Sequence, residues 1–189
     1  MDREEKIRAF LALPLGEAFE ASVRSVVEKL KNQHPEIKWV QPSQIHVTLH
    51  FFGPIESRVI PKISDGVVPV TQKTKPLKLS LQGMGGFPSL ERPRVIWGGI
   101  EGEVEALTHL WFSLEERFTK LGFECEKRTF KPHLTLGRVR EGKRGPLLKN
   151  IEFGPTEMKL VSEIALFKSI LSSAGPKYEK IETFSLSAA

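Results

Sequence analysis

"HVTLHF" at residues 46–51 and "HLTLGR" at residues 133–138 are the two stretches that decide the fold of this chain. Apolar and polar side chains alternate in both, and a period of two is typical of a strand with one buried face. His46 and Thr48 therefore share one face of the first strand, as His133 and Thr135 share one face of the second. The sequence predicts two strands that each present one imidazole and one hydroxyl.

Strands and helices are mixed along the rest of the chain. Helices are expected over residues 15–31, 57–70 and 103–121, the second of them weakened by prolines. Strands are expected over residues 7–14, 38–53, 77–84, 94–100, 123–139, 157–169 and 178–186, with a loop at 85–93 and a proline interruption in each motif region. Several strands follow one another directly, and no stretch is typical of a linker. We therefore predict the α+β class and a single two-lobed domain over residues 1–189.

The two motifs, together with a long helix in each half of the chain, predict two related lobes. A duplication would place His46 and His133 on either side of a pseudo-twofold axis. The other parts of the two halves do not visibly align. If both motif strands line one groove, that groove contains two imidazoles and two hydroxyls.

The composition limits the class of protein. The chain has 189 residues, of which 40% are hydrophobic and 27% charged, and this excludes the disordered and fibrous classes. A single cysteine, Cys125, cannot form an internal disulfide. No apolar run approaches the roughly 20 residues that cross a bilayer, and the N-terminal segment is a poor secretory signal. We expect a cytoplasmic protein without a membrane segment.

Positive charge is concentrated around the second motif. The net charge is +5, and between residues 127 and 144 only Glu141 opposes seven cations: Lys127, Arg128, Lys131, Arg138, Arg140, Lys143 and Arg144. A local field of this sign favours a phosphate-bearing partner. A solvated basic loop is the alternative that the segment alone leaves open.

Two imidazoles and two hydroxyls suit attack on a phosphate ester. A neutral imidazole can remove a proton from the nucleophile while an imidazolium protonates the leaving oxygen, since the histidine pKa lies near neutrality. Threonine hydroxyls can donate hydrogen bonds to non-bridging phosphate oxygens. No metal or cofactor is expected, because the chain has no HExxH, no Cys-His cluster and no Asp-rich triplet. One such motif alone is usually a partly buried histidine, but two in strands favour a functional pair.

The paired motifs resemble the two-histidine phosphoesterase superfamily, in particular its RNA 2′,3′-cyclic phosphodiesterase branch, also called 2′-5′ RNA ligase. The resemblance covers nearly the whole chain: "RAFLALPL" at 8–15, "KWVQPSQIHVTLHFFG" at 38–53, "GMGGFPSLERPRVIWGGI" at 83–100 and "GFECEKRTFKPHLTLGRV" at 122–139. It implies a bilobal duplicated fold, with two mainly antiparallel sheets and flanking helices around a central groove.

The resemblance also implies the roles of the motif residues. His46 would be the proton donor and His133 the proton acceptor, while Thr48 and Thr135 would bind the phosphate. The family chemistry opens a 2′,3′-cyclic phosphate at an RNA end and leaves a 2′-phosphate; an RNA 5′-hydroxyl in place of water gives a 2′-5′ linkage without ATP. The residues themselves do not order the two histidines. The implied partner is RNA with a cyclic phosphate end, tRNA fragments included, and we expect a monomer that needs no membrane.

Three further residues are candidates for substrate contact. Many relatives carry Arg or Lys two positions after the first threonine, where this chain has His50; on a regular strand His50 would share the face of His46 and either meet substrate or lie on the surface. Arg138 matches a basic residue after the second motif, but would face away from His133 unless Gly137 permits a bulge. Phe130 can stack on a base, although a core role is favoured.

Two other functions stay open on the sequence alone. One is a nucleotide- or RNA-binding module with the same groove, although pure binding does not require both an acid and a base. The other is a phosphodiesterase that acts on small cyclic phosphates, such as an ADP-ribose cyclic phosphate or a cyclic nucleotide. The basic segment favours longer substrates.

Overall fold

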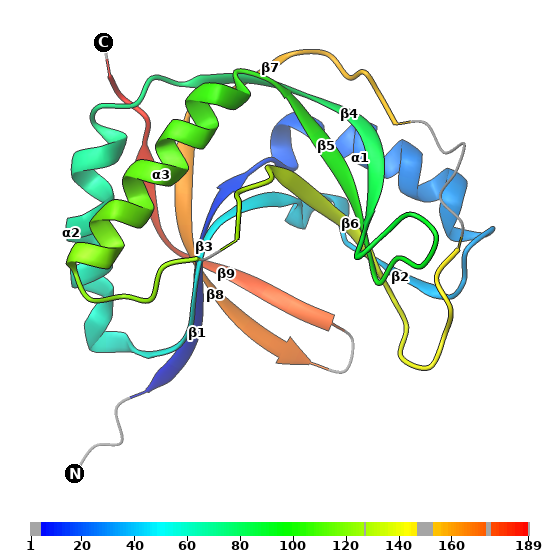
Figure 1. Ribbon diagram of the computed structural model, residues 1–189, viewed down its shortest axis with the longest axis horizontal. Coiled ribbons are helices and arrows are strands. Elements are labelled where there is room, and N and C mark those ends of the chain that lie inside the picture. The colour runs from blue at the N-terminus through cyan, green and yellow to red at the C-terminus, as the bar shows by residue number, and fades with distance from the viewer. Residues whose placement is uncertain (1–4, 127, 147–152, 173–174, 189) are drawn as a thin grey trace.

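The structure, a computed structural model, describes residues 5–126, 128–146, 153–172 and 175–188. Its elements follow one another as a mixture of strands and helices (Figure 1). In chain order they are β1 (Lys6–Pro14), α1 (Gly16–Lys31), β2 (Ile37–Trp39), η1 (Pro42–Gln44), β3 (His46–Glu56), η2 (Ser57–Val59), α2 (Ile60–Thr71), β4 (Leu77–Phe87), β5 (Val95–Gly102), α3 (Val104–Lys120), β6 (His133–Val139), β7 (Lys159–Val161), β8 (Glu163–Ser172) and β9 (Gly175–Ser185).

The strands form two antiparallel sheets. Sheet A has the order β3-β1-β8-β9, and sheet B has the order β2-β6-β5-β4-β7. β2 comes from the first half of the chain but lies in sheet B, whereas β8 and β9 come from the second half and lie in sheet A. The predicted α+β fold of two antiparallel sheets with flanking helices is thus confirmed, and the halves exchange strands.

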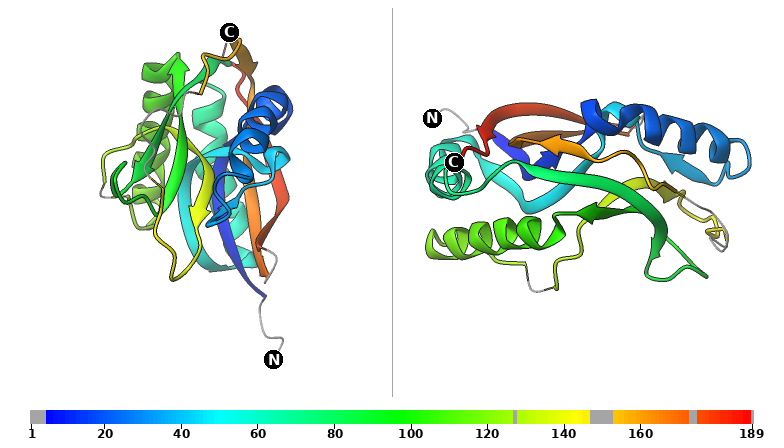
Figure 2. Two further views of the ribbon diagram at one scale, coloured as in Figure 1. Left: turned by 90° about the vertical axis from the view of Figure 1, so that its right-hand side faces the viewer. Right: turned by 90° about the horizontal axis from the view of Figure 1, so that it is seen from above.

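The helices cover the two sheets unequally. α1 contacts β2 and β7 of sheet B, whereas α3 contacts β3 of sheet A and β4 of sheet B, and α2 packs against α3 and β9 (Figure 2). Each helix buries one apolar stripe at helical spacing, such as Phe19, Val23 and Val27 in α1 or Leu107, Leu114 and Phe118 in α3. The two sheets meet along β3 and β6, so the two motif strands contact each other.

Three expected element boundaries are wrong. β3 continues through Gly53 and Pro54 to Glu56 because it is an edge strand, where a proline leaves no ladder hydrogen bond unmade. β4 runs on to Phe87, into the expected loop at 85–93. A strand was expected at 123–139, but among its described residues only His133–Val139 form one. Residues 123–126 and 128–132 run along α3 instead.

The segment expected as one strand at 157–169 divides at Ser162. β7 pairs with β4 in sheet B, while β8 pairs with β1 in sheet A. Apolar residues occur in both pieces, as Leu160-Val161 and as Ile164–Phe167, so the sequence pattern alone does not show where the chain passes from one sheet to the other.

Both motif strands contain a bulge at the leucine of the His-x-Thr-Leu tetrad. In β3, Thr48 lies opposite Ala12 and Phe51 lies opposite Phe10, so three steps along β3 match two along β1. In β6, Thr135 lies opposite Trp97 and Arg138 lies opposite Val95, again three steps against two. The duplication therefore includes the irregularity at the leucine of each tetrad as well as the residue pattern.

The bulges decide which side chains return to the motif face. Cross-strand partners share a face of the sheet, and Phe10 and Ala12 of β1 lie on the same face. Phe51 therefore rejoins the face of His46 and Thr48, and Arg138 rejoins the face of His133 and Thr135. A regular strand would have placed the preceding residues, His50 and Gly137, on this face.

We expect Gly137→Ala to disturb the second bulge and to destabilise the protein. A Cβ at this position would lie 2.6 Å from Ile37 Cγ2 and 3.3 Å from the Lys38 carbonyl oxygen, so β2 would have to move. Overpacking of this kind lowers the free energy of unfolding by about 1–3 kcal/mol. Urea denaturation measures it. In an Ile37→Ala background, which removes the clashing methyl, Gly137→Ala should cost less free energy of unfolding. If Gly137→Ala alone is as stable as the parent protein, the steric argument is contradicted.

Candidate active site

The two motif histidines are oriented in the same way. His46 Nδ1 lies 2.8 Å from the Gln44 carbonyl oxygen, and His133 Nδ1 lies 2.6 Å from the Lys131 carbonyl oxygen. A carbonyl only accepts, so Nδ1 carries the proton in both rings. In each case the carbonyl belongs to the residue two positions earlier. Nε2 is thereby left to exchange a proton with a ligand.

Aromatic side chains from other strands pack against both imidazoles. The His46 ring lies 5.0 Å from the Phe10 ring and 5.2 Å from the Tyr178 ring, the latter edge to face. The His133 ring lies 5.1 Å from Phe87 and 6.1 Å from Trp97. These contacts fix the rings and remove water from their faces. The sequence analysis did not identify these four aromatics, because only the sheet pairings bring them to the motifs.

Burial lowers the pKa of both imidazoles. For His46 the burial is partly offset by the hydrogen bond to Gln44, and the positive charges of Arg138 and His133 lower the pKa further. For His133 burial again lowers the pKa most, with the hydrogen bond to Lys131 opposing it and Arg138 adding to it. The two histidines and Arg138 thus lie close enough to interact. An anionic ligand between them would favour the charged forms instead.

The threonines complete the pair of motifs. Thr48 is exposed and Thr135 is partly buried, each on the face of its histidine. Within the described ranges neither hydroxyl forms a hydrogen bond. Both are therefore available to donate to a ligand that sits between the two imidazoles.

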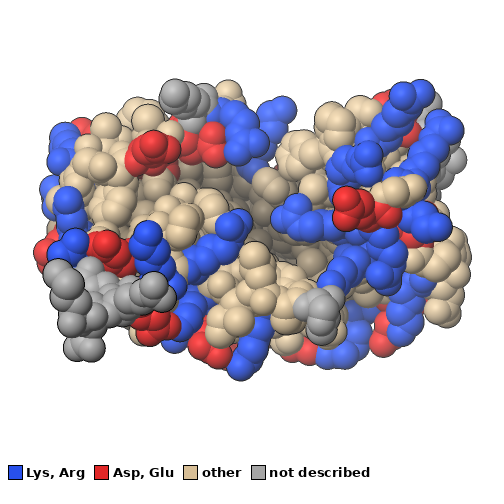
Figure 3. Space-filling model, turned by 90° about the horizontal axis from the view of Figure 1, so that it is seen from below, with Lys and Arg blue, Asp and Glu red and all other residues tan. Residues whose placement is uncertain are grey.

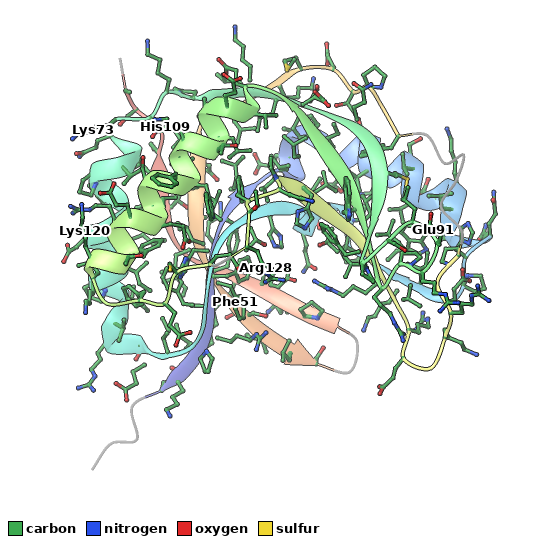
Figure 4. All side chains as sticks on the ribbon, viewed as in Figure 1. Phe51, Lys73, Glu91, His109, Lys120 and Arg128 are labelled. Carbon is green, nitrogen blue, oxygen red and sulfur yellow. The ribbon has the colours of Figure 1, made fainter. Side chains whose placement is uncertain are left out.

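Arg138 faces the groove because of the bulge that Gly137 permits. Its positive charge acts on His46, on His133 and on Tyr178, so it lies near all three. The corresponding position in β3 is Phe51, which is 50% exposed and whose ring lies 4.5 Å beneath the guanidinium of Arg8 (Figure 4). Sequence reasoning missed Phe51, since a regular alternation directs it to the opposite face.

His50 does not face the groove, which corrects the expectation that it shares the face of His46. It is only 5% exposed and packs between the rings of Phe52 and Phe118. Its Nδ1 contacts Glu115 Oε1 of α3, and Glu115 is 7% exposed. The bulge turned this residue to the outer face of sheet A, where α3 covers it.

Phe130 stacks on a protein ring rather than in the groove. Its ring is parallel to that of Trp111, at 4.9 Å. Other described residues on this side of β6 are also held on α3: the Phe123 backbone N–H donates to the Phe118 carbonyl, and the Glu126 N–H donates to Glu115 Oε2 at 2.9 Å. Lys131, which orients His133, directly follows Phe130. The core role weighed for Phe130 is the one that these contacts support.

The surface is hollowed in its middle, and lysine and arginine side chains lie on both sides of the hollow (Figure 3). Arg138, Arg140, Lys143 and Arg144 of the expected cationic cluster are exposed. Arg128 is exposed but pairs with Glu126. Lys127 lies outside the described residues.

A cavity of about 420 Å³ opens beside His46. Polar groups that line it include Ser43, Gln44, Tyr178 and Lys180, together with Glu17 and Glu163.

Within the described part of the chain, no three His, Cys, Asp or Glu side chains are grouped so that they could hold a metal ion. No helix of that part is both long and apolar enough to cross a membrane.

This fold, with a His-x-Thr strand in each sheet and the two strands in contact, is that of a two-histidine phosphoesterase. The family of LigT-like phosphoesterases matches residues 13–97 and 100–178. The chain therefore belongs to the LigT-like phosphoesterase family.

Several curated and solved proteins are similar to the chain over nearly its whole length. An RNA 2′,3′-cyclic phosphodiesterase of Methanothermobacter thermautotrophicus is 37% identical over 96% of this chain and all of its own, and one of Archaeoglobus fulgidus is 33% identical over 94% and 99%. The crystal structure of a Thermus thermophilus protein has a TM-score of 0.78 at 29% identity, covering 96% and 99% of the two chains. Escherichia coli LigT with 3′-AMP has a TM-score of 0.75 at 24% identity, with coverage of 96% and 99%, and shares the fold.

Loss of the Glu115 carboxylate should destabilise the protein strongly. Glu115→Ala leaves a buried imidazole without its partner and removes the acceptor of the Glu126 N–H, and breaking such a pair costs about 3 kcal/mol. Urea denaturation gives the difference. Glu116→Ala, one position on and exposed with Lys120 as its partner, is the matched control and should change little. Equal effects of the two substitutions would contradict the buried role.

Acidification should destabilise the protein through its motif histidines. Below about pH 6.5 the unfolded chain binds protons at His46 and His133, whereas burial lowers their pKa in the folded protein. The unfolded state then holds more protons, so the free energy of unfolding falls as the pH falls below that value. His46→Gln should flatten this slope in denaturation curves taken between pH 5 and 8; a slope as steep as the parent's would contradict it.

Proposed function

We propose that this protein hydrolyses the 2′,3′-cyclic phosphate ends of RNA to 2′-phosphates, without a metal ion. The observation that carries the proposal is the convergence of two imidazoles, two unengaged threonine hydroxyls and Arg138 on one groove. The relatives at 33% and 37% identity bear the name of this activity. Pure binding would need the cations and hydroxyls but not two imidazoles with the same Nδ1 anchor.

The reaction follows from the two free Nε2 atoms. His133, as proton acceptor, removes a proton from water, and the water oxygen attacks phosphorus. The bond from phosphorus to O3′ breaks, and His46, as proton donor, protonates O3′. Thr48, Thr135 and Arg138 bind the non-bridging oxygens, where negative charge increases in the transition state. The anchored Nδ1–H of each ring keeps Nε2 as the reacting atom throughout.

The same groove allows ligation. If an RNA 5′-hydroxyl replaces water, the same bond to O3′ breaks and a 2′-5′ linkage forms, with the strain of the cyclic ester supplying the energy in place of ATP. tRNA fragments with cyclic ends are among the substrates that fit this reaction. We further propose that the protein acts as a cytoplasmic monomer.

The decisive assay uses an RNA that ends in a 2′,3′-cyclic phosphate, with EDTA present. We expect turnover to a 2′-phosphate, and at least about a 10²-fold loss of kcat/KM in His46→Ala and in His133→Ala, the lower range for general acid–base catalysis. Product position is read from resistance to a 3′-phosphatase. No turnover, a requirement for added metal, or full activity in both variants would overturn the proposal.

The pH dependence of the same variants separates donor from acceptor. One imidazole must be charged and one neutral, so kcat/KM should be bell-shaped; because burial lowers both pKa values, its maximum should lie on the acid side of about pH 6.5. Residual activity in His46→Ala should lose the alkaline limb, and in His133→Ala the acid limb. The opposite pattern would exchange the two roles.

Hydrolysis of a small cyclic phosphate is a second candidate. The cavity of about 420 Å³ beside His46 has the volume of a small-ligand site and presents polar groups. This candidate shares the chemistry of the first and differs in the substrate beyond the reacting phosphate. Comparison of kcat/KM on a cyclic mononucleotide and on an oligonucleotide separates the two.

A further inference from the structure

Five arginines gather at one end of sheet B, beyond the two motifs. They lie in the loop between β4 and β5, at the end of β6 and in the loop that follows β6, and all are exposed: Arg92, Arg94, Arg138, Arg140 and Arg144. We call this set the arginine end.

The loops that carry the arginine end are fastened to each other. The Val139 N–H donates to the Arg94 carbonyl at 2.9 Å, and Arg94 Nη1 donates to the Lys143 carbonyl at 3.5 Å. Gly145 fits so closely against Pro93 that a Cβ there would lie 2.2 Å from the Pro93 carbonyl oxygen. The cations therefore project from a fixed backbone, which lowers the entropy cost of holding a ligand.

The charges of the arginine end are not neutralised within the described ranges. None of its guanidinium groups forms an ion pair there, whereas Arg24, Arg58 and Arg128 elsewhere each pair with a glutamate. Glu91 and Glu141 lie in the same loops, while Glu36 precedes β2, accepts the Arg140 backbone N–H through its carbonyl and contacts His34 through its carboxylate. An excess of exposed guanidinium groups thus faces solvent, and guanidinium is the cation best suited to bidentate phosphate contacts.

Arg138 joins the arginine end to the reacting groups. Its charge acts on both motif histidines, and in β6 it lies opposite Val95, directly after Arg94. The cavity beside His46 is lined by Glu17 and Glu163 as well as Lys180, so negative charge lies on that side of the site. A polyanion that has its end between the histidines is therefore attracted along sheet B toward Arg94 and Arg144.

We propose that the arginine end binds the phosphates of the RNA strand that precede its cyclic end, so that the enzyme prefers a strand of several nucleotides to a cyclic mononucleotide. This inference rests on the proposed function and specifies its substrate. Each phosphate contact would make binding weaker as salt rises, with a slope of roughly −0.7 per contact for a single strand.

The test compares two double variants that remove the same charge. Arg92→Gln with Arg144→Gln leaves Arg138 and the Arg94 loop contact intact, while Lys73→Gln with Lys75→Gln changes the opposite end of the molecule, where Figure 4 shows Lys73 far from Glu91. Values of kcat/KM are measured on a 2′,3′-cyclic mononucleotide and on an RNA of roughly ten nucleotides with the same end, over a range of salt.

In the arginine variant, we expect KM for the oligonucleotide to rise at least about fivefold and the salt slope to fall by roughly 1.4, that is, two contacts at 0.7 each. Turnover of the mononucleotide should not change, and the lysine variant should match the parent. Equal losses on both substrates, equal losses in both variants, or an unchanged oligonucleotide KM would overturn the inference.

Failure of the proposed function gives a different result from failure of this inference. If the parent turns over neither substrate, the proposed function fails. Fluorescence anisotropy with an RNA that ends in a 2′-phosphate then tests RNA binding by the arginine end without any turnover. Weaker binding by the arginine variant, with the lysine variant equal to the parent, supports the inference. Equal binding by all three proteins overturns it.

Discussion

From the threonine of its His-x-Thr-Leu tetrad, each motif strand takes three residue steps against two of its neighbour, and the site depends on this shared bulge at the leucine. Pairing across the strands then brings Phe51 and Arg138 back to the face of the histidines. Without the bulge, the cation nearest to both imidazoles would point into the opposite side of sheet B. The duplication thus gives the two halves one backbone design, with an aromatic ring at the fifth position after one histidine and a guanidinium after the other.

The bulge in β3 also places His50 in the core, on the face opposite to the groove. His50, turned outward from the groove, meets Glu115 of α3 in an apolar setting, and Glu115 also holds the backbone of Glu126. Phe130 stacks on Trp111 of the same helix, and the carbonyl of the next residue, Lys131, orients His133. The buried pair therefore joins the strand of the first histidine to α3, the helix that also contacts the residue before Lys131.

Without a bound anion, burial and nearby positive charge in the groove favour the neutral form of both imidazoles. Aromatic contacts bury both rings, and the nearby guanidinium of Arg138 opposes their protonation. A phosphate between them would reverse this preference, because its charge stabilises an imidazolium. Cations farther along sheet B extend the attraction beyond the reacting phosphate, so charge selects the ligand and the paired rings carry out the proton transfers.

The sequence by itself determined the features that arise from local periodicity: the motif strands, the amphipathic helices, the α+β class, and the pairing of each histidine with its threonine on one face. Side chains two residues apart share a face wherever a strand is regular, so no distant contact was needed. The tertiary structure alone decided what depends on pairing between distant segments. It set the exchange of strands between halves, the break at Ser162, the contacts of Phe123, Glu126 and Phe130 with α3, and the faces of His50, Phe51 and Arg138. A bulge is a mismatch between two strands, and one strand's sequence does not specify it.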